Sequence, residues 1–364
     1  MRILIVHHDT AGLAHDARVL ASAVRARRPE AEILVRTVDA RFGSDPELTF
    51  PVEGEPGGSK AGFDAIFLLG HAYLEPKSFV KERFGTVLFV PDIDRVNAKD
   101  ETALVSGAID AVLFKTRHAE RVAAGRPAFR EVASRHLVGW TSEDVRLADA
   151  GMRFDRALHV RGMSRQKQTA TVLETWSRHG AMLPPLEVFA RVEDPFRLPA
   201  PATISGNTVL HLGEVSRDKV IAAMNNRGLH VCPSSASGFG HSLNEARAVG
   251  AVAITTGAAP MNELIADEET GFLVPSVPGP GLEGMYVGQE LIDAAGMLET
   301  MERAMSWPDR RLREMGALAR RDYEAGKAGF EERLGAVVSD LATRKSVGAG
   351  LFGWLGRRGA AISP

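Results

Sequence analysis

The sequence has little cysteine, no excess charge of either sign and no long hydrophobic run. A single cysteine among 364 residues excludes an internal disulfide framework. The 44 basic and 46 acidic side chains give a formal net charge of -2, without the basic footprint of a nucleic-acid-binding protein. No apolar stretch approaches the roughly 18 residues of a membrane-spanning helix. We therefore expect a cytoplasmic protein with no nucleic-acid partner.

The first ten residues and the single cysteine both have ordinary structural explanations. The segment MRILIVHHDT holds an apolar run of only four residues, which is too short for a secretory signal and is typical of a strand. Cys232 ends the apolar run GLHVC and has no neighbours at metal-ligand spacing. We expect it to be a buried thiol.

Short β-branched runs alternate along the chain with longer helical patterns. Runs that are apolar on both faces and alternate with helices predict parallel sheets covered on both sides. Strands are predicted at 2–6, 32–38, 65–70, 86–91, 110–115, 135–140, 157–162, 186–192, 208–213, 228–234, 251–256 and 271–275. Helices are predicted at 13–28, 167–178, 217–225, 241–249 and 260–266, with a charged helical end at 287–344.

The length and this alternation together predict two domains. We expect an α/β protein in which two Rossmann-like domains face each other across a cleft, followed by C-terminal helices. The predicted boundaries are 1–148 for the first domain, 149–340 for the second and 341–364 for a tail. The strand pattern restarts after a polar stretch near 141–156, which supports the division.

A glycine-rich loop that leads into a predicted helix is the most informative segment. Gly238 and Gly240 allow the backbone to approach a ligand, and the helix begins near His241. The free N–H groups and positive dipole of a helix start suit a phosphate, and parallel sheets bind ligands at the carboxyl ends of their strands. Glu245 lies about one turn into this helix, where its carboxylate can accept hydrogen bonds from vicinal hydroxyls such as those of a ribose.

The segments SGFGHSLNEA, GAVAITT, GAAPMNEL and TGFLVP follow one another within residues 232–275. In their order and spacing the chain resembles glycosyltransferase family 4, the retaining GT-B enzymes also called glycosyl transferases group 1. The resemblance is specific over about 157–275 and looser over the first 150 residues. It implies transfer of a sugar, with retention, from a nucleotide-diphosphate sugar to a glycan, lipid or small-molecule acceptor. It also implies that no metal or cofactor is used, because positioning and electrostatic support of the departing phosphate carry the reaction.

The resemblance assigns roles to residues on both sides of the cleft. In the loop RGMSRQKQT, Lys167 with Arg161 or Arg165 would neutralise the leaving diphosphate. His71 would face the transferred sugar from the first domain, unless it is simply a satisfied polar residue at a strand end. Gly12 would lie near the acceptor. The donor-binding residues would be Glu214 and Val215 against the base, Glu245 on the ribose, and Ser237, Gly238, Phe239, Gly240, His241, Ser242 and Leu243 in the glycine-rich loop and the helix start. For His241, a contact with the donor phosphate and a cap on the turn are both open.

Two departures from the family pattern leave alternatives to an active transferase. Ser237 stands where the signature has its first Glu, and Met163 stands where the phosphate loop usually has a basic residue. One alternative is a catalytically weak or inactive GT-B protein that binds a nucleotide sugar or a partner. A sugar-nucleotide epimerase is a second, although the signature argues against it. The segment HHDTAGLAHD after the first strand lacks the G-x-G-x-x-G fingerprint, which argues against a nicotinamide dehydrogenase.

Two segments combine apolar and cationic residues in a way that can also dock on anionic lipid. RVLASAVRARR at 18–28 has a cationic end, and LFGWLGRRG at 351–359 joins aromatic residues to arginines. The alternative for each is a helix that packs one face on its own domain, or a loose terminus. Peripheral contact with the inner face of a membrane therefore stays an open alternative.

Overall fold

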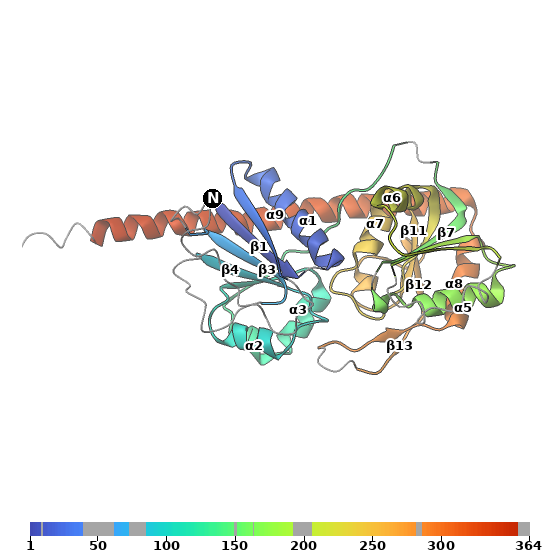
Figure 1. The fold of residues 1–364 in the computed structure, drawn as a ribbon, viewed down its shortest axis with the longest axis horizontal. Coiled ribbons are helices and arrows are strands. Elements are labelled where there is room, and N and C mark those ends of the chain that lie inside the picture. The colour runs from blue at the N-terminus through green and yellow to red at the C-terminus, as the bar shows by residue number, and fades with distance from the viewer. Residues whose placement is uncertain are drawn as a thin grey trace, which may run out of the picture.

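Two parallel β-sheets lie side by side, each with helices on its faces (Figure 1). The structure, a computed structural model, describes residues 1–8, 10–38, 62–72, 85–148, 151–162, 164–191, 206–281 and 286–355, with side chains to residue 341. Each large sheet has six strands, and a third sheet is a short two-stranded pair. The predicted α/β class with two Rossmann-like domains is confirmed.

The first sheet has the strand order β2-β1-β3-β4-β5-β6. The order reverses between β1 and β3, so a crevice opens there at the carboxyl ends of the strands. Helix α1 and the end of α9 cover one face of this sheet, and α2, α3 and α4 cover the other. The strands are β1 (Arg2–His8), β2 (Glu32–Val38), β3 (Ala65–Gly70), β4 (Thr86–Pro91), β5 (Ala111–Phe114) and β6 (Ser134–Leu137). The helices are α1 (Ala11–Arg27), α2 (Ala98–Val105), α3 (Arg117–Ala124), α4 (Pro127–Arg130) and α9 (Asp309–Leu355).

The second sheet has the order β12-β11-β10-β7-β8-β9 and reverses between β10 and β7. Helices α5, α8 and the start of α9 cover one face, and α6 and α7 cover the other. The strands are β7 (Arg153–Gly162), β8 (Leu186–Ala190), β9 (Thr208–Leu212), β10 (Arg227–Val231), β11 (Val252–Thr256) and β12 (Gly271–Val274), with the pair β13 (Val277–Pro278) and β14 (Glu290–Leu291). The helices are α5 (Thr169–His179), α6 (Arg217–Asn226), α7 (His241–Val249) and α8 (Ala294–Met305), with 3-10 turns η2 (Arg165–Lys167) and η5 (Met261–Glu263).

Every predicted strand overlaps an observed one, with ends that differ by up to four residues at β6, β7 and β10, and the helix predictions fail in two places. The helix predicted at 260–266 is wrong, because only the turn η5 forms there. The chain turns between Ala266 and Thr270, because the Ala266 N–H donates to the Thr270 hydroxyl. Strand β12 begins at the next residue, Gly271. The helical end predicted from residue 287 is also wrong at its start. Strand β14 occupies that stretch, and Pro308, which has no N–H, separates α8 from α9.

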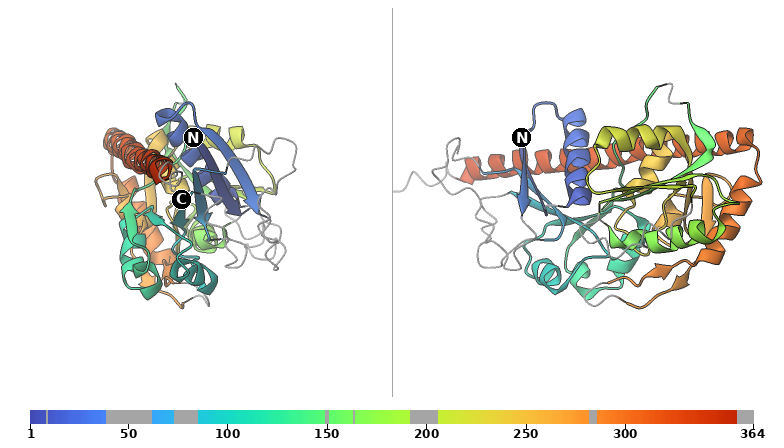
Figure 2. Two further views of the ribbon diagram at one scale, coloured as in Figure 1. Left: turned by 90° about the vertical axis from the view of Figure 1, so that its left-hand side faces the viewer. Right: turned by 45° about the vertical axis from the view of Figure 1, so that its right-hand side comes forward.

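Helix α9 joins the two domains into one body. It has 47 residues, which corresponds to about 70 Å at 1.5 Å per residue. Leu312 and Met315 near its start lie in the core of the second domain, whereas Phe330 and Leu334 lie in the core of the first. Figure 2 shows the helix running along both domains. The domain boundaries stay a prediction, but α9 belongs to both cores.

The segment that links the domains is fastened to α9. The Tyr323 hydroxyl donates to the Ser142 carbonyl oxygen at 2.9 Å, and Arg320 forms two hydrogen bonds of 2.7 Å with the Asp144 carboxylate. Arg333 donates from Nε to the Val138 carbonyl oxygen at 2.8 Å. These bonds hold the linker against a rigid helix and so limit how the domains move relative to each other.

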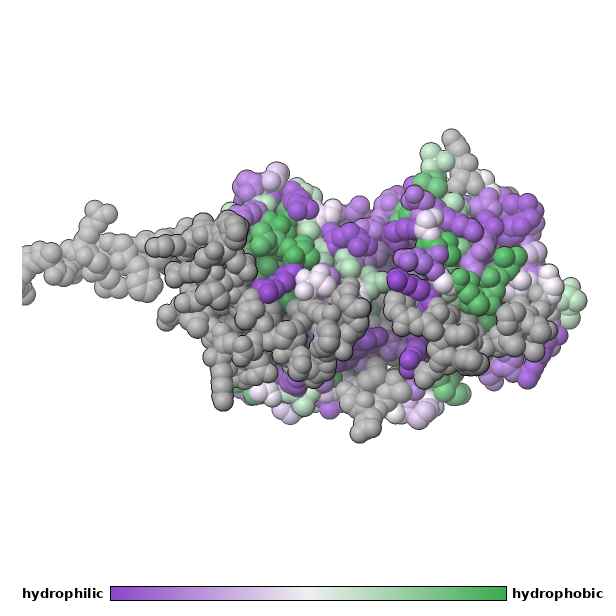
Figure 3. All heavy atoms as spheres, viewed as in Figure 1, coloured by the Kyte–Doolittle hydropathy of each residue, from purple (hydrophilic) through white to green (hydrophobic). Residues whose placement is uncertain are grey.

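The structure also bears on the two candidate membrane segments. In α1, which contains residues 18–28 except the last, Val19, Leu20 and Val24 are buried in the core of the first domain, so this apolar face does not meet a membrane. The side chains of 351–359 lie outside the described residues. Within the described part of the chain, no helix combines the length and the apolar character needed to cross a bilayer. On the face shown in Figure 3, hydrophobic surface falls into separate patches rather than one band.

Replacing Phe330 tests whether α9 supports the first domain. Its side chain is fully buried and packs on Trp140, with ring centroids 4.9 Å apart. We expect Phe330→Ala to lower the free energy of unfolding by about 3–5 kcal/mol, because it leaves a cavity in a core. Chemical denaturation followed by circular dichroism measures this. Arg321→Ala, at an exposed position of the same helix, is the control and should stay within about 0.5 kcal/mol. Equal effects of both changes would contradict the role of α9 in this core.

Candidate functional site

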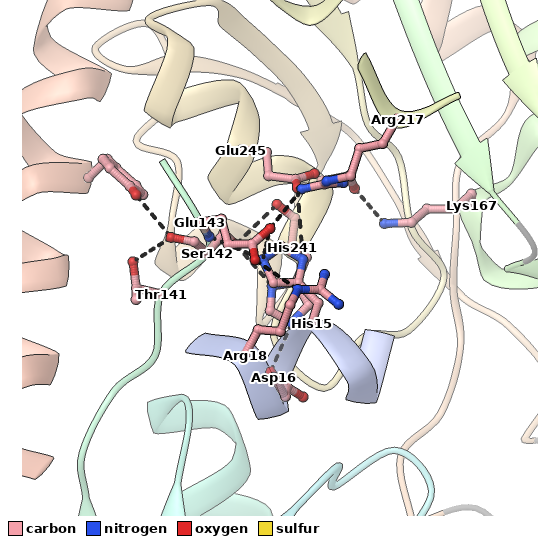
Figure 4. Close-up of polar contacts among 12 residues, drawn as sticks. His15, Asp16, Arg18, Thr141, Ser142, Glu143, Lys167, Arg217, His241 and Glu245 are labelled. Carbon is pink, nitrogen blue, oxygen red and sulfur yellow. Dashed lines mark hydrogen bonds and ion pairs between the residues drawn. The ribbon is translucent and has the colours of Figure 1, made fainter. Parts of the chain in front are cut away.

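Polar and charged side chains from both domains meet in the cleft between them (Figure 4). From the first domain they come from α1 and from the loops after β4 and β5. From the second domain they come from η2, the start of α6 and the start of α7. Both sheets present the carboxyl ends of their strands here, where open α/β sheets bind ligands.

The glycine-rich loop between β10 and α7 forms one wall of the cleft. Gly240 directly precedes the helix and has a φ of +103°, a backbone conformation that residues with a side chain rarely adopt. A Cβ atom on Gly238 would lie 2.6 Å from an oxygen of Asp92 in the first domain, so only glycine allows this approach. Phe239 is buried in the core of the first domain, which anchors the loop across the cleft. Ser237 lines a cavity of about 350 Å³ together with His118 of α3.

Lys167 and Glu245 lie on either side of the α7 start. The Lys167 ammonium donates to the Ser242 hydroxyl at 2.7 Å, and burial lowers the pKa of this lysine. Glu245 is buried, and its carboxylate accepts a hydrogen bond from Arg217 at 3.2 Å. Leu243 points the other way and packs beside Cys232 under the helix. The predicted lysine, serine and glutamate are thus brought together.

Cys232 is buried, as predicted, and burial raises the pKa of its thiol to about 11. A neutral thiol here is a packing group under α7. It takes no part in the polar contacts of the cleft beyond a weak bond to the Ser242 carbonyl oxygen.

The remaining predicted donor residues lie around this centre. Burial, and then the neighbouring Arg165, lowers the pKa of Arg161 at the end of β7. Arg165 is exposed on η2. Glu214 follows β9 with 80% of its side chain exposed, 3.9 Å from Arg191. Val215 is half-buried against the α6 side of the sheet. Met163 lies outside the described residues.

His71 and Gly12, the two residues predicted to act from the first domain, have different surroundings. The Nδ1 atom of His71 lies 3.0 Å from the Asp100 carboxylate, and its ring meets His8 edge-on with centroids 5.4 Å apart. This histidine is therefore already bound within its own domain. Gly12 is exposed at the start of α1, and a Cβ atom placed on it would meet nothing within 4 Å.

His241 connects the domains instead of capping its helix. Gly240 is the N-cap residue of α7, and both ring nitrogens of His241 have partners elsewhere: Nε2 lies 2.8 Å from Asp16 of α1, and Nδ1 lies 2.9 Å from the Ser142 hydroxyl. Its ring also stacks on His15, with centroids 4.2 Å apart and planes 14° apart. The ring thus reaches across to the first domain, and a contact of His241 with the donor phosphate stays a prediction.

The sequence analysis did not single out three charged residues on the first-domain side of the cleft: Lys115, Asp16 and Asp92. The ammonium of Lys115, directly after β5, is buried and forms ion pairs with Asp16 and with Asp92, the latter at 2.7 Å. Burial alone would raise the pKa of Asp16, but Lys115 and His241 hold it well below its usual range. Lys115 and Asp92 each directly follow a strand of the parallel sheet, which is the signal that could have indicated them.

A second ionic group lies beside the first. Glu143 of the linker bonds to Arg18 at 2.8 Å and to Arg217 at 3.0 Å. Its backbone N–H donates to Nε2 of His15 at 3.1 Å. Since Arg217 also holds Glu245, this chain of contacts joins α1, the linker and α7.

Comparison with known proteins agrees with this architecture. Residues 192–278, which contain the glycine-rich loop and Glu245, match the family model of glycosyl transferases group 1. The fold is the GT-B fold. A sucrose-phosphate synthase from Thermosynechococcus elongatus superposes with a TM-score of 0.66 at 16% identity, covering 94% of this chain and 100% of that one. Anabaena HepE in complex with UDP and glucose gives 0.61 at 12%, covering 93% and 100%.

A third structural match is to a longer protein. A chain of the GtfA/B complex gives a TM-score of 0.58 at 15% identity, over 77% of this chain and 58% of that one. This chain therefore spans little more than half the length of that protein. At these identities the structures show the fold alone. No curated protein sequence matches the chain.

The buried His15 predicts a pH-dependent stability. Burial, and then His241, lowers its pKa to about 3. The folded protein therefore keeps His15 neutral, whereas the unfolded chain binds a proton below about pH 6.5. The free energy of unfolding should fall as the pH drops below about 6.5, by up to about 1.4 kcal/mol per pH unit from this residue. His15→Gln should flatten that slope in urea denaturation between about pH 6.5 and 4. The exposed His136→Gln is the control and should keep the original slope. Parallel profiles for the original protein and His15→Gln would contradict the buried neutral state.

Proposed function

We propose that the protein is a retaining glycosyltransferase of family 4 type that moves a sugar from a nucleoside-diphosphate sugar to a hydroxyl-bearing acceptor. The observation that carries the proposal is the meeting of Lys167, Ser242 and Glu245 at the start of α7. A cation beside a helix N-terminus favours a diphosphate, because charge and free N–H groups act together. A buried carboxylate one turn further along suits the ribose hydroxyls. The family match over 192–278 supports this assignment.

The roles of the other residues follow from their positions. Arg161 and Arg165 stand beside Lys167 on the same loop, so their charges add to its support of the leaving diphosphate. In the reaction the anomeric carbon–oxygen bond to the diphosphate breaks, and a bond to the acceptor oxygen forms on the same face of the sugar. The acceptor's proton leaves with the diphosphate. The protein's part is to hold the donor and to stabilise the charge that develops on the diphosphate.

The donor can be proposed more narrowly than the acceptor, for which only broad chemical classes are proposed. HepE and this chain share the fold, and HepE is known in complex with UDP and glucose, so UDP-hexoses come first among the donors to test. The acceptor would be a glycan or a lipid-linked or small molecule bound by the first domain. Metal independence is part of the same proposal, because cationic side chains would replace a metal at the diphosphate.

A binding protein without transferase activity is the second candidate. It is favoured by Ser237, which brings a hydroxyl to the cavity beside α3 where the family signature has a carboxylate. The two candidates share a donor site and differ in turnover. Release of free sugar or transfer from the donor, lost in Lys167→Met, would exclude the binding protein.

Two substitutions in the donor site test the proposal. Thermal shift against UDP, GDP, dTDP and their sugars should find at least one stabilising ligand, because a ligand that binds only the folded state raises stability. Glu245→Ala should weaken that ligand about tenfold or more, since a hydrogen bond to a charged group is worth about 1.5–3 kcal/mol. Lys167→Met should lower kcat about 100-fold or more by removing a charge at the leaving group.

The control for these variants is Lys219→Met, which removes an exposed cation on α6 and should change neither quantity. Circular dichroism should show each variant folded. A panel in which no nucleotide or nucleotide sugar shifts the unfolding midpoint would overturn the proposed function.

A further inference from the structure

Asp94 is a buried carboxylate with an oxygen that lacks a hydrogen-bond donor. It lies in the loop after β4 and is 2% exposed. Its Oδ2 is 3.5 Å from the side-chain nitrogen of Gln166, across the cleft. Within the described residues, its Oδ1 has no partner. Buried polar atoms in native proteins nearly always find a partner, because an unpaired one costs free energy. A missing donor at this place therefore points to a ligand.

The surroundings of Asp94 place it between the two donor loops of the second domain. Gln166 directly precedes Lys167, and its backbone carbonyl oxygen accepts from the N–H of Ser235 at 2.7 Å. Asp92, two residues before Asp94, lies so near Gly238 that a Cβ atom there would be 2.6 Å from its carboxylate oxygen. The loop after β4 thus faces both the proposed diphosphate loop and the glycine-rich loop.

The charges around Asp94 decide what kind of group can approach it. The Asp92 carboxylate raises the pKa of Asp94, whereas the cations Arg95 and Lys115 act in the opposite direction. The Lys115 ammonium is bonded to Asp16 and Asp92 rather than to Asp94. A diphosphate would be repelled by two carboxylates, so it belongs on the Lys167 side. A neutral hydroxyl group can donate to an ionised carboxylate, which only accepts hydrogen bonds.

We propose that Asp94 binds a hydroxyl group of the transferred sugar and so fixes the sugar's orientation on the first-domain side of the cleft. This inference rests on the proposed function and adds a specificity-determining residue to it. The residue comes from the opposite domain to the donor-binding loops. A bound sugar hydroxyl would supply the donor that Oδ1 lacks.

The ionisation of Asp94 gives the inference a pH signature. Burial, and then the Asp92 carboxylate, raises its pKa to about 6, against the lowering effect of Arg95 and Lys115. Gln166 faces it from η2 and carries no charge. Above about pH 6 the carboxylate is ionised and accepts from the sugar, whereas below it the protonated group loses an acceptor. The KM for the nucleotide sugar should therefore rise as the pH falls through about 6.

The test compares nucleotide and nucleotide sugar on the full chain carrying Asp94→Asn. Calorimetry with UDP against UDP-glucose, and with GDP against GDP-mannose, separates binding of the diphosphate from binding of the sugar. We expect the nucleotide sugar to bind about tenfold more weakly and the nucleotide alone to bind as before. The rise of KM near pH 6 should disappear in the variant. Asp155→Asn, at the exposed start of β7, is the matched control and should alter nothing.

The outcomes distinguish this inference from the proposed function. If neither nucleotides nor nucleotide sugars bind the original protein, the proposed function fails and the inference falls with it. If they bind, and Asp94→Asn weakens UDP and UDP-glucose equally or leaves both unchanged, the inference alone is overturned. A change confined to the KM of the acceptor would overturn it as well. The unfolding midpoint of Asp94→Asn serves as the check on folding, and removal of an unpaired buried charge should not lower it at neutral pH.

Discussion

The ammonium of Lys115 between the carboxylates of Asp16 and Asp92 is the interaction on which the cleft depends. All three groups are charged and largely removed from water, so none is tolerated there without the others. Asp16 in turn bonds to His241 of the second domain, and a side chain in place of Gly238 would collide with Asp92. One buried cation thereby holds two carboxylates against the α7 end of the glycine-rich loop.

The second constraint on the cleft is the packing of helix α9 into both domains. Helix α9 contributes Met315 to one core and Phe330 to the other, and between them it fastens the linker through Tyr323 and Arg320. The helix is unbroken between the two cores, so the contact of His241 with Asp16 joins domains that α9 also holds together. Packing sets the approximate orientation of the domains, and the charged contacts select the final one.

Both domains bring charges of both signs to the cleft. The second domain presents the cations Lys167, Arg161 and Arg165 near η2, and the loop after β4 in the first domain presents the carboxylates Asp92 and Asp94. A molecule that joins an anionic diphosphate to a neutral sugar would bind there in one orientation, with the diphosphate beside the cations and the sugar beside the carboxylates. In the proposed function a nucleotide sugar would contact both sides of the cleft, whereas a free nucleotide would contact one.

The sequence by itself determined most of the strands, the two-domain class and the glycine-rich segment that matches the family model. These depend on local features: apolar runs of strand length, glycines before a helix, and the spacing from Gly238 to Glu245. It did not determine His241's partner, because residues 16 and 241 meet only when two domains dock. The same holds for Lys115, Asp92 and Asp94, which are ordinary charged residues after strands until the fold buries them. Only the tertiary structure decided which charges face each other, since burial and pairing depend on contacts between residues far apart in the chain.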